Sequence, residues 1–396
     1  MQDAWHDAKL SGEESPRKSE IMFIRSMPSV NAEGCRIVFD RQPPNASRGD
    51  RYESGEIGSD AQRRVVDEKA LKSIADSWFG YLVGSVFLTG IGDLIGGLLT
   101  GAFVGIYAGL AYGDEIVGMT DAQEIASTMM GLLPDWLATG QAYLASIGVW
   151  LVALLWFLRK ANKPIWKAID RRSAGNNFRN LMIGFALGAA LNGFCAFAAC
   201  MLGSISLDFS SFNIAYALIL LVCVFIQSSA EELVCRGYLY QKLLNKYKRP
   251  VVAIVGNAAI FAAFHLLNPG VTVLSIVDIM VCGILFSLLV YYFDSIWMAM
   301  AAHTAWNYLQ SIVLGLPNSG NVLPYSIFKL DAASARDGLA YTTGFGLEGS
   351  IMAILVQVVA IAALIYLIKK NGTRITDIWE TRPIMDETDV ESKETA

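Results

Sequence analysis

Eight long apolar segments between residues 79 and 368 leave this chain little choice of fold. Each approaches the roughly 20 residues that cross a bilayer as a helix. Inside lipid every backbone polar group must be satisfied within the protein, so continuous segments of this length favour α-helices. We therefore predict an all-α fold, a polytopic membrane helix bundle with about eight transmembrane helices. The expected spans are 79–111, 140–158, 181–203, 214–234, 251–267, 273–293, 296–315 and 351–368.

The composition agrees with a membrane protein and excludes several classes of soluble protein. The chain has 396 residues, of which 54% are hydrophobic and 17% are charged. It contains no block of Lys and Arg of the kind that follows nucleic acid, so we expect no nucleic-acid partner. The six cysteines show no C-x-x-C spacing, so we predict no disulfide framework. The bilayer itself is the first expected partner.

Charge divides the chain into three parts and orients it. We expect a disordered cytosolic tail over residues 1–75, a transmembrane domain over 76–372 and a polar tail over 373–396. With eight spans, the basic segments 159–179, 242–249 and 369–374 all fall on one side, together with both ends of the chain. Positively charged loops stay in the cytosol. We therefore predict a multi-pass protein of the cell membrane with cytosolic N- and C-termini.

The first apolar segment carries glycines at every fourth position. Small residues at this spacing let two helices approach closely in lipid. We expect them to pack inside the bundle; the alternative is a homo-oligomer seam. A helix hairpin broken at Asp93 is a further alternative, which would reverse the side of every later loop. The repeat consists of Gly97, Gly101, Gly105, Gly109 and Gly113.

Two adjacent glutamates, Glu231 and Glu232, lie at the end of an apolar helix. Ionisable groups at membrane depth are costly and are candidates for function. Arg236 is four residues after Glu232, which places the two on one helix face as an ion pair. Glu231 points about 100° away and has no local cation, which suits a general base. The alternative is a structural ion network that fixes the register of the helix.

Only three histidines occur in the chain, and two of them lie in expected spans. His6 is in the polar tail, whereas His265 and His303 are surrounded by apolar residues. Asn307 follows His303 by one turn on the same helix face. A single buried histidine is more often a satisfied core residue than a catalytic one. Two of them near a glutamate pair favour an active site inside the membrane.

These motifs resemble one known family. E-E-x-x-x-R at 231–236, F-x-x-x-H at 261–265 and H-x-x-x-N at 303–307 follow in this order on successive helices. The pattern is similar to that of the CPBP family of intramembrane proteases. These comprise CAAX proteases and bacteriocin-processing, abortive-infection-like proteins. The match covers roughly 180–315, which identifies 76–372 as a protease domain with this core. The stretch 345–350 also resembles bacterial members.

The resemblance implies a role for each matching residue. Glu231 is similar to the catalytic glutamate, and His265 to the histidine that helps it activate water. His303 and Asn307 resemble the pair that stabilises the oxyanion, while Glu232 and Arg236 resemble the supporting charge pair. The implied reaction hydrolyses a peptide bond in a membrane-associated or lipidated peptide or protein. The family is described in part as a group of metalloproteases.

A metal site and two other functions remain as alternatives. Glu231, His265 and His303 are donors of the kind that bind zinc or another divalent metal. The compact zinc motif H-E-x-x-H is absent, so we favour a mechanism without a metal or other cofactor. A non-enzymatic bacteriocin-immunity or scaffold protein could keep the same fold. An ion-coupled transporter is less consistent with the sequence, which has no second copy of the glutamate motif.

Overall fold

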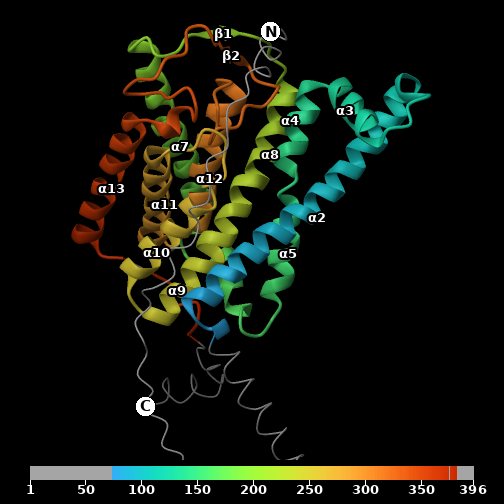
Figure 1. Cartoon of the computed structure of the whole chain (residues 1–396). Helices are drawn as coiled ribbons and strands as arrows, with labels where there is room; N and C mark the ends of the chain where they lie inside the picture. Colours follow the sequence, from blue (N-terminus) through green and yellow to red (C-terminus); the bar gives the residue numbers. More distant parts are fainter. Residues whose placement is uncertain (1–73, 374, 381–396) are drawn as a thin grey trace, which may run out of the picture. The chain divides into compact units, whose positions relative to one another are not determined.

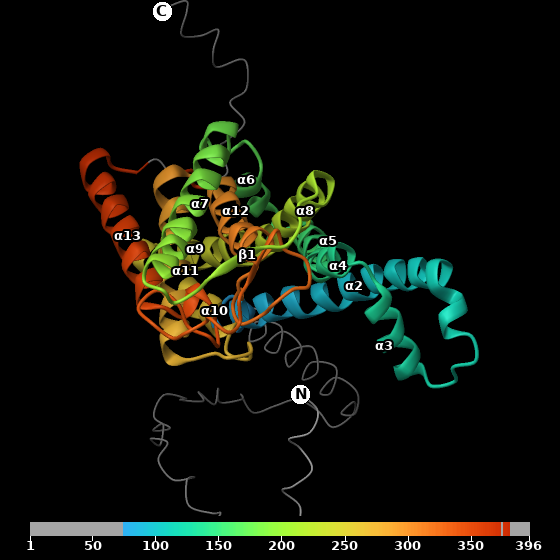
Figure 2. The ribbon, with the colours of Figure 1, turned by 90° about the horizontal axis from the view of Figure 1, so that it is seen from above.

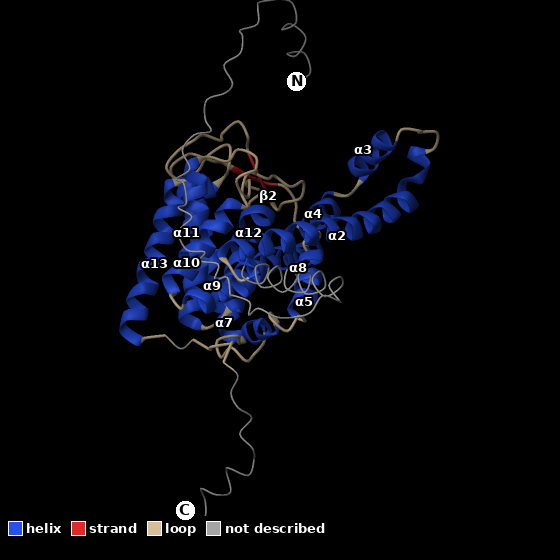
Figure 3. Cartoon of the chain, turned by 60° about the horizontal axis from the view of Figure 1, so that its bottom comes forward, coloured by secondary structure: helices blue, strands red, loops and turns tan. Residues whose placement is uncertain are grey.

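The computed structural model describes residues 74–373 and 375–380. These residues form a bundle of helices with one short two-stranded ribbon (Figures 1 and 3). The all-α, helical membrane bundle predicted from the sequence is confirmed. The expected tails, over 1–75 and 373–396, lie almost entirely outside the described residues.

The helices begin and end close to the predicted boundaries. The α-helices are α2 (Trp78–Tyr112), α3 (Ala122–Leu132), α4 (Asp135–Leu144), α5 (Ile147–Phe157), α6 (Trp166–Ile169), α7 (Phe178–Met201), α8 (Ile214–Glu232), α9 (Tyr240–Tyr247), α10 (Pro250–Ala263), α11 (Val273–Phe293), α12 (Ile296–Asn307) and α13 (Ile351–Asn371). Two π-helical segments, η3 (Leu233–Leu239) and η4 (Tyr308–Val313), continue α8 and α12. Short 3₁₀ turns are η1 (Gly113–Ile116), η2 (Lys163–Ile165) and η5 (Leu347–Gly349).

Each of the eight apolar segments contains helix, but their lengths differ. Among the described residues, six helices are long and apolar enough to cross a membrane. They are Trp78–Ile116, Asp135–Phe157, Phe178–Met201, Ile214–Tyr247, Val273–Phe293 and Ile351–Asn371. The other two, α10 and α12, are shorter, so the exact count of eight spans is not confirmed.

Helix α10 ends earlier than the predicted span 251–267. It stops at Ala263, and His265 lies in the turn that follows rather than inside a helix. Pro269 lacks the N–H that a continuing helix needs, and Gly270 adopts a positive φ of 69°. This Pro-Gly pair explains why the chain turns here.

Helix α12 is the most enclosed element and sets the position of His303. All of its residues except Trp297 are buried. It packs against α7, where Gly184 and Gly188 face the backbone oxygens of Met298 and Ala302. A Cβ at either glycine would lie within 2.3 Å of these oxygens, so only glycine permits the close approach.

Helix α2 is one continuous helix of 35 residues, which excludes a hairpin at Asp93. It packs on α5 through Gly92 and Gly96, which meet Val149 and Gly148 at backbone distance. The chain breaks between α4 and α5 at Ala145, next to this contact, and the carbonyl of Ala145 faces Gly96. Figure 2 shows α2 running past the other helices, with α3 at its far end.

The predicted packing of the glycine repeat inside the bundle is wrong for the described chain. Gly97, Gly105 and Gly113 have no neighbour within 4 Å, and Gly101 and Gly109 reach one side-chain atom each, at 4.0 Å. The physical reason is helical geometry: Gly92 and Gly96 form one face that α5 fills. The repeat starts one residue later, about 100° around the helix, and faces away from the bundle.

The two ends of the bundle differ in character. At one end, strands β1 (Leu207–Phe209) and β2 (Phe328–Leu330) pair antiparallel and the loop 316–349 folds over the helices (Figure 1). At the other end the basic segments meet: Lys242 donates to the carbonyl of Ala161 at 2.9 Å, and Lys167 to that of Glu380 at 3.1 Å. The predicted grouping of the segments 159–179 and 242–249 is therefore consistent with the fold.

Candidate active site

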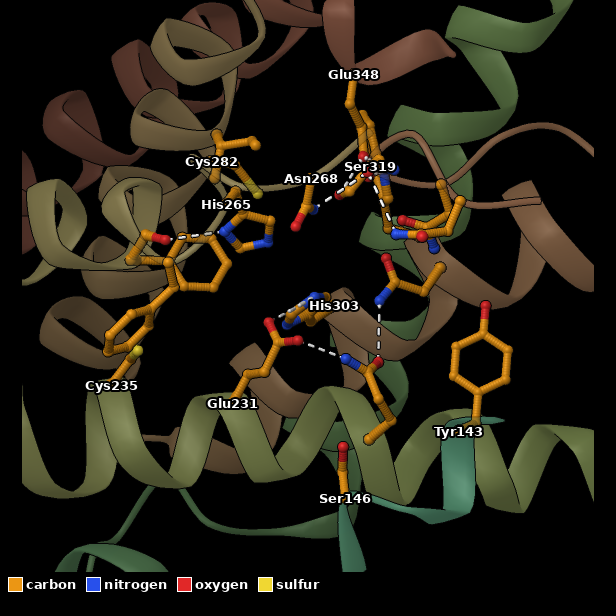
Figure 4. A pocket seen from close by; sticks show the side chains of 18 of the residues that line it. Tyr143, Ser146, Glu231, Cys235, His265, Asn268, Cys282, His303, Ser319 and Glu348 are labelled. Atoms are coloured by element: carbon orange, nitrogen blue, oxygen red, sulfur yellow. Dashed lines mark hydrogen bonds and ion pairs between the residues drawn. The ribbon is translucent and has the colours of Figure 1, made fainter. Parts of the chain in front are cut away.

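A cavity of about 530 Å³ opens between the helices that carry the sequence motifs. It is lined by polar and apolar side chains from α2, α4, α8, η3, α10, α11, α12, α13 and the loop 316–349. Figure 4 shows Glu231 and His303 close together, with His265 facing them across the cavity. Four predicted site residues line the cavity, namely Glu231, His265, His303 and Asn307. The other two, Glu232 and Arg236, lie behind it.

Glu232 and Arg236 form the ion pair that their spacing predicts. Glu232 Oε1 lies 2.9 Å from Arg236 Nη1, and both side chains are fully buried. Arg236 also donates from Nη2 to the carbonyl of Gly283 at 2.9 Å, and its guanidinium lies 4.6 Å from the ring centre of Phe261. The cation is thus held by a carboxylate, a carbonyl and an aromatic face. The guanidinium neutralises Glu232 and does not reach the cavity.

Glu231 is the carboxylate that faces the cavity. Its side chain is 29% exposed, whereas that of Glu232 is fully buried. Gln227, one turn earlier on α8, donates its amide to Glu231 Oε1. Glu231 Oε2 has no hydrogen-bond partner in the described part of the chain, and the nearest cationic candidate is His303 Nε2 at 3.9 Å. One oxygen is therefore fixed and the other is left to bind water or substrate.

His303 lies between the two glutamates. Its Nδ1 is 2.9 Å from Glu232 Oε1, which already accepts from Arg236. Because that carboxylate can only accept, Nδ1 carries a proton and Nε2 faces Glu231. The ring also packs on Phe286, at 5.2 Å between centres. Glu232 thus fixes the orientation of His303, a link between helices that the sequence did not predict.

His265 is oriented from its own backbone. Its Nδ1 lies 2.9 Å from the carbonyl oxygen of Phe261, four residues earlier in F-x-x-x-H. A carbonyl accepts only, so Nδ1 carries the proton and Nε2 keeps its lone pair. The edge-to-face contact with the Phe261 ring, at 5.0 Å, fixes the ring plane. His265 therefore presents a base to the cavity without needing a carboxylate partner.

Asn307 is held beside the glutamate helix. Its Nδ2 donates to Ser228 Oγ at 3.1 Å and lies 3.4 Å from Gln227 Oε1. Gln227 thus contacts both Glu231 and Asn307. It is a site residue that sequence analysis missed, because Gln227 and Asn307 are 80 positions apart and nothing local links them.

Both site helices become π-helical at their motifs, η3 within E-E-x-x-x-R and η4 directly after H-x-x-x-N. The π-helical segment η3 begins at Leu233, after Glu232, and η4 begins at Tyr308, after Asn307. Single π turns inside α-helices occur frequently at functional sites. Glu231 and Glu232 precede η3, whereas Arg236 lies inside it; His303 and Asn307 both precede η4.

A third carboxylate, Glu348, joins three parts of the cavity wall. Trp306 Nε1 donates to its Oε1 at 2.9 Å, while the backbone N and the Oγ of Ser319 donate to its Oε2, both at 2.6 Å. Asn268 donates to the carbonyl of Ser319 at 3.1 Å. Ser319 has a positive φ of 47°, an unfavourable conformation for a residue with a side chain. This set of contacts, which we term the Glu348 clamp, holds the loop 317–321 over the site. Sequence analysis noted only its surrounding stretch 345–350.

The donors predicted for a metal do not come together as a set of three. Within residues 74–373 and 375–380, no group of three or more His, Cys, Asp and Glu side chains has the spacing of a metal site. His303 Nε2 and Glu231 Oε2 are within reach of one ion at zinc-ligand distances of about 2 Å. His265, the third donor, is not part of such a group. The arrangement does not fit the predicted ligand set.

Comparison with known proteins gives one match, and it covers the site. Residues 213–309 match the family described as type II CAAX prenyl endopeptidase Rce1-like. No curated protein and no solved structure matches the chain. The matched segment contains all three motifs, from Glu231 to Asn307, and it supports intramembrane endopeptidase activity in general. The CPBP/CAAX protease family predicted from the motifs is thereby confirmed: residues 213–309 of this chain form an Rce1-like domain.

Proposed function

We propose that this protein is an intramembrane endopeptidase that cleaves a membrane-associated or lipidated peptide with water activated by Glu231 and His265. The observation that carries the proposal is that the two adjacent glutamates have different surroundings. Glu232 is neutralised by Arg236, whereas Glu231 faces the cavity with a free oxygen. A base of this kind needs a reactive carboxylate next to the place where substrate binds.

The attacking water is held between two acceptors. Glu231 Oε2 and His265 Nε2 both present lone pairs to the cavity, so each can accept one of the two protons of a water molecule. Gln227 prevents the Glu231 carboxylate from rotating by holding its other oxygen. The water oxygen then keeps its own lone pairs for the scissile carbonyl carbon.

The developing oxyanion is stabilised by His303 and Asn307. With Nδ1 donating to Glu232, His303 serves as a donor to the oxyanion from Nε2 in its imidazolium form. Asn307 has one weak contact, at 3.4 Å from Gln227 Oε1, which it can exchange for the oxyanion. Removing one such donor typically lowers the rate about 10²–10³-fold.

The bond changes follow from these positions. The water oxygen forms a bond to the carbonyl carbon while Glu231 takes a proton. The tetrahedral intermediate collapses, the C–N bond breaks, and Glu231 returns the proton to the leaving amine. The products are a new carboxyl group and a new amine; the carboxyl group gives its remaining proton to the amine, leaving a carboxylate and an ammonium group, and the glutamate ends in its starting state.

Comparison of cleavage products in whole membranes tests the proposal. New peptide ends are quantified by mass spectrometry in cells that carry the wild type, Glu231→Gln or Glu124→Gln. Glu124 is an exposed residue of α3 and serves as the control. We expect a cleaved product that is present in the wild type and the control and absent from Glu231→Gln. Persistence of all products in Glu231→Gln would contradict the proposed base. An immunity or scaffold protein would leave the products unchanged and still act in cells.

The proposed mechanism uses no metal. We expect purified protein to hold no zinc in stoichiometric amounts, and its activity to survive chelation. The zinc content is measured by elemental analysis in the same preparation as the cleavage rate. Loss of activity on chelation, with recovery when zinc is restored, would replace this mechanism with a metal-dependent one.

A further inference from the structure

The cavity beside Glu231 is acidic, and one of its carboxylates is not explained by the proposed reaction. Among its described lining residues are four carboxylates, from Asp93, Glu231, Asp278 and Glu348, and no Lys or Arg. Glu231 is the proposed base, and Glu348 accepts three hydrogen bonds in the clamp. Asp93 is exposed, and its Oδ1 lies 3.5 Å from Ser146 Oγ. Asp278 is the remaining one.

Asp278 is buried, and few hydrogen bonds or charges offset its negative charge. It lies on α11 and is 1% exposed. Its Oδ1 accepts one hydrogen bond, from Gln357 Nε2 on α13 at 3.0 Å. No ion pair to Asp278 occurs in the described part of the chain, whereas Glu232, equally buried, has both Arg236 and His303. An ionised carboxylate at such depth is strongly unfavourable unless a positive group or several donors approach it, and without them the group takes up a proton.

Gln357 adds a second unsatisfied acceptor at the same place. It is also 1% exposed, and its Oε1 has no hydrogen-bond partner in the part of the chain that the structure describes. A contact that served only to tie α11 to α13 would not need a carboxylate or an unpaired oxygen. With Asp278 ionised, the pair presents acceptors to the cavity and offers no donor to it.

We propose that Asp278 and Gln357 form a subsite for a basic group of the bound peptide, a Lys or Arg side chain or a free amine. Such a group supplies both the charge and the N–H donors that the pair lacks. One carboxylate and one amide oxygen are too few for Ca²⁺, which takes 6–8 oxygen ligands. The inference rests on the proposed function, since it assigns the peptide that this cavity takes.

Peptide binding to Glu231→Gln protein tests the subsite without requiring cleavage. The probes are fluorescent apolar peptides of one length, in which a single Lys is moved through each position. Two further series carry norleucine, which has a similar shape and no charge, or Glu at the same positions. We expect Lys to strengthen binding at least tenfold over norleucine at one register, and Glu to weaken it there.

Two variants assign that preference to Asp278. In Glu231→Gln/Asp278→Asn the Lys and norleucine peptides should bind equally, while Glu231→Gln/Asp208→Asn, altered at an exposed residue of β1, should keep the preference. Adding Gln357→Glu to Asp278→Asn moves the carboxylate to α13 and keeps the hydrogen bond, so it should restore the preference. This swap also controls for a folding defect in Asp278→Asn.

The outcomes separate this inference from the proposed function. Equal binding of the Lys and norleucine peptides at every register would overturn the subsite, as would a preference that survives Asp278→Asn or an absence of binding by all three series. Cleavage by the wild type without a Lys preference would refute the subsite alone. A Lys preference without any cleavage would refute the peptidase and leave the subsite standing.

Discussion

At the scale of single residues, the site depends on how charges are paired. Spacing along one helix predicted the Glu232–Arg236 pair, because neighbours four residues apart are fixed by local geometry. It did not predict that His303 shares the same oxygen of Glu232, or that Gln227 holds Glu231. His303 meets Glu232 from another helix, and Gln227 has no motif of its own that would indicate the contact. His265 was placed in a helix, although Pro269 nearby already argued for a turn.

The buried pair gives a prediction about stability. Glu232→Gln should leave Arg236 buried without its counter-charge and lower the free energy of unfolding by about 3–5 kcal/mol. Glu231→Gln should have a much smaller effect, because that side chain is partly exposed and its cationic neighbour, His303 Nε2, is 3.9 Å away. Thermal unfolding in detergent, followed by fluorescence, compares the two. Adding Arg236→Met to Glu232→Gln should recover part of the loss. Equal melting temperatures for both single variants would refute this assignment of the charges.

At the scale of elements, apolar length and loop signals predicted where helices lie, but not which faces meet. The glycine repeat from Gly97 to Gly113 shows the difference. Spacing alone cannot distinguish it from the neighbouring Gly92 and Gly96, and only the position of α5 decides which face is filled. The Glu348 clamp could not be predicted from the sequence either. It joins Glu348 to residues 29 and 42 positions away, one in a loop and one in a helix.

The Glu348 clamp gives the second prediction. In Glu348→Gln the amide N–H₂ replaces one acceptor oxygen and faces a donor, from Trp306 or Ser319, so a buried hydrogen bond is lost at about 1–3 kcal/mol. We expect faster hydrogen–deuterium exchange in the segment 317–321 and slower cleavage. Glu115→Gln, at an exposed residue of η1, is the control. Unchanged exchange in 317–321 would show that the carboxylate does not hold the loop.

The open glycine face of α2 gives the third prediction, on the partner of this chain. Since this face is not filled from within, we propose that a second copy packs on it. A cysteine at Gly105 should then form a disulfide-linked homodimer in native membranes under mild oxidation. Phe103→Cys, an exposed position on another face of the same turn, should not. Equal cross-linking at the two positions would indicate random collision instead of a specific seam.

At the scale of the whole described bundle, the arrangement of charge gives an orientation. The basic segments meet at one end, and β1, β2 and the loop 316–349 cover the other. Because basic loops tend to stay in the cytosol, we propose that the first end of the described bundle faces the cell interior. The sequence could predict the positions of the helices and the grouping of the basic loops, because the bilayer imposes the same apolar length and the same charge asymmetry on every span. The number of complete crossings depends on how deep α10 and α12 lie, which hydropathy does not encode.

Cysteine labelling tests this orientation in the cell membrane. In a background with Cys35 and Cys200 replaced by serine, a cysteine is introduced at Arg171 or at Lys329, each exposed. A reagent that cannot cross the membrane should label position 329 in intact cells and position 171 only after permeabilisation. The reverse pattern would invert the topology, and labelling of both positions would contradict the predicted sidedness.

The length of α2 links the site to the lipid around it. Its 35 residues extend over roughly 52 Å at 1.5 Å per residue, well beyond a hydrocarbon core of about 30 Å. Such hydrophobic mismatch is relieved by tilting, and the tilt required grows as the bilayer thins. Helix α2 supplies Thr89 and Asp93 to the cavity wall, so we expect a change in its inclination to alter the width of the cavity. The thickness of the host membrane thus becomes a variable of the reaction, and the cleavage rate should change with the acyl-chain length of the lipids in which the protein is reconstituted.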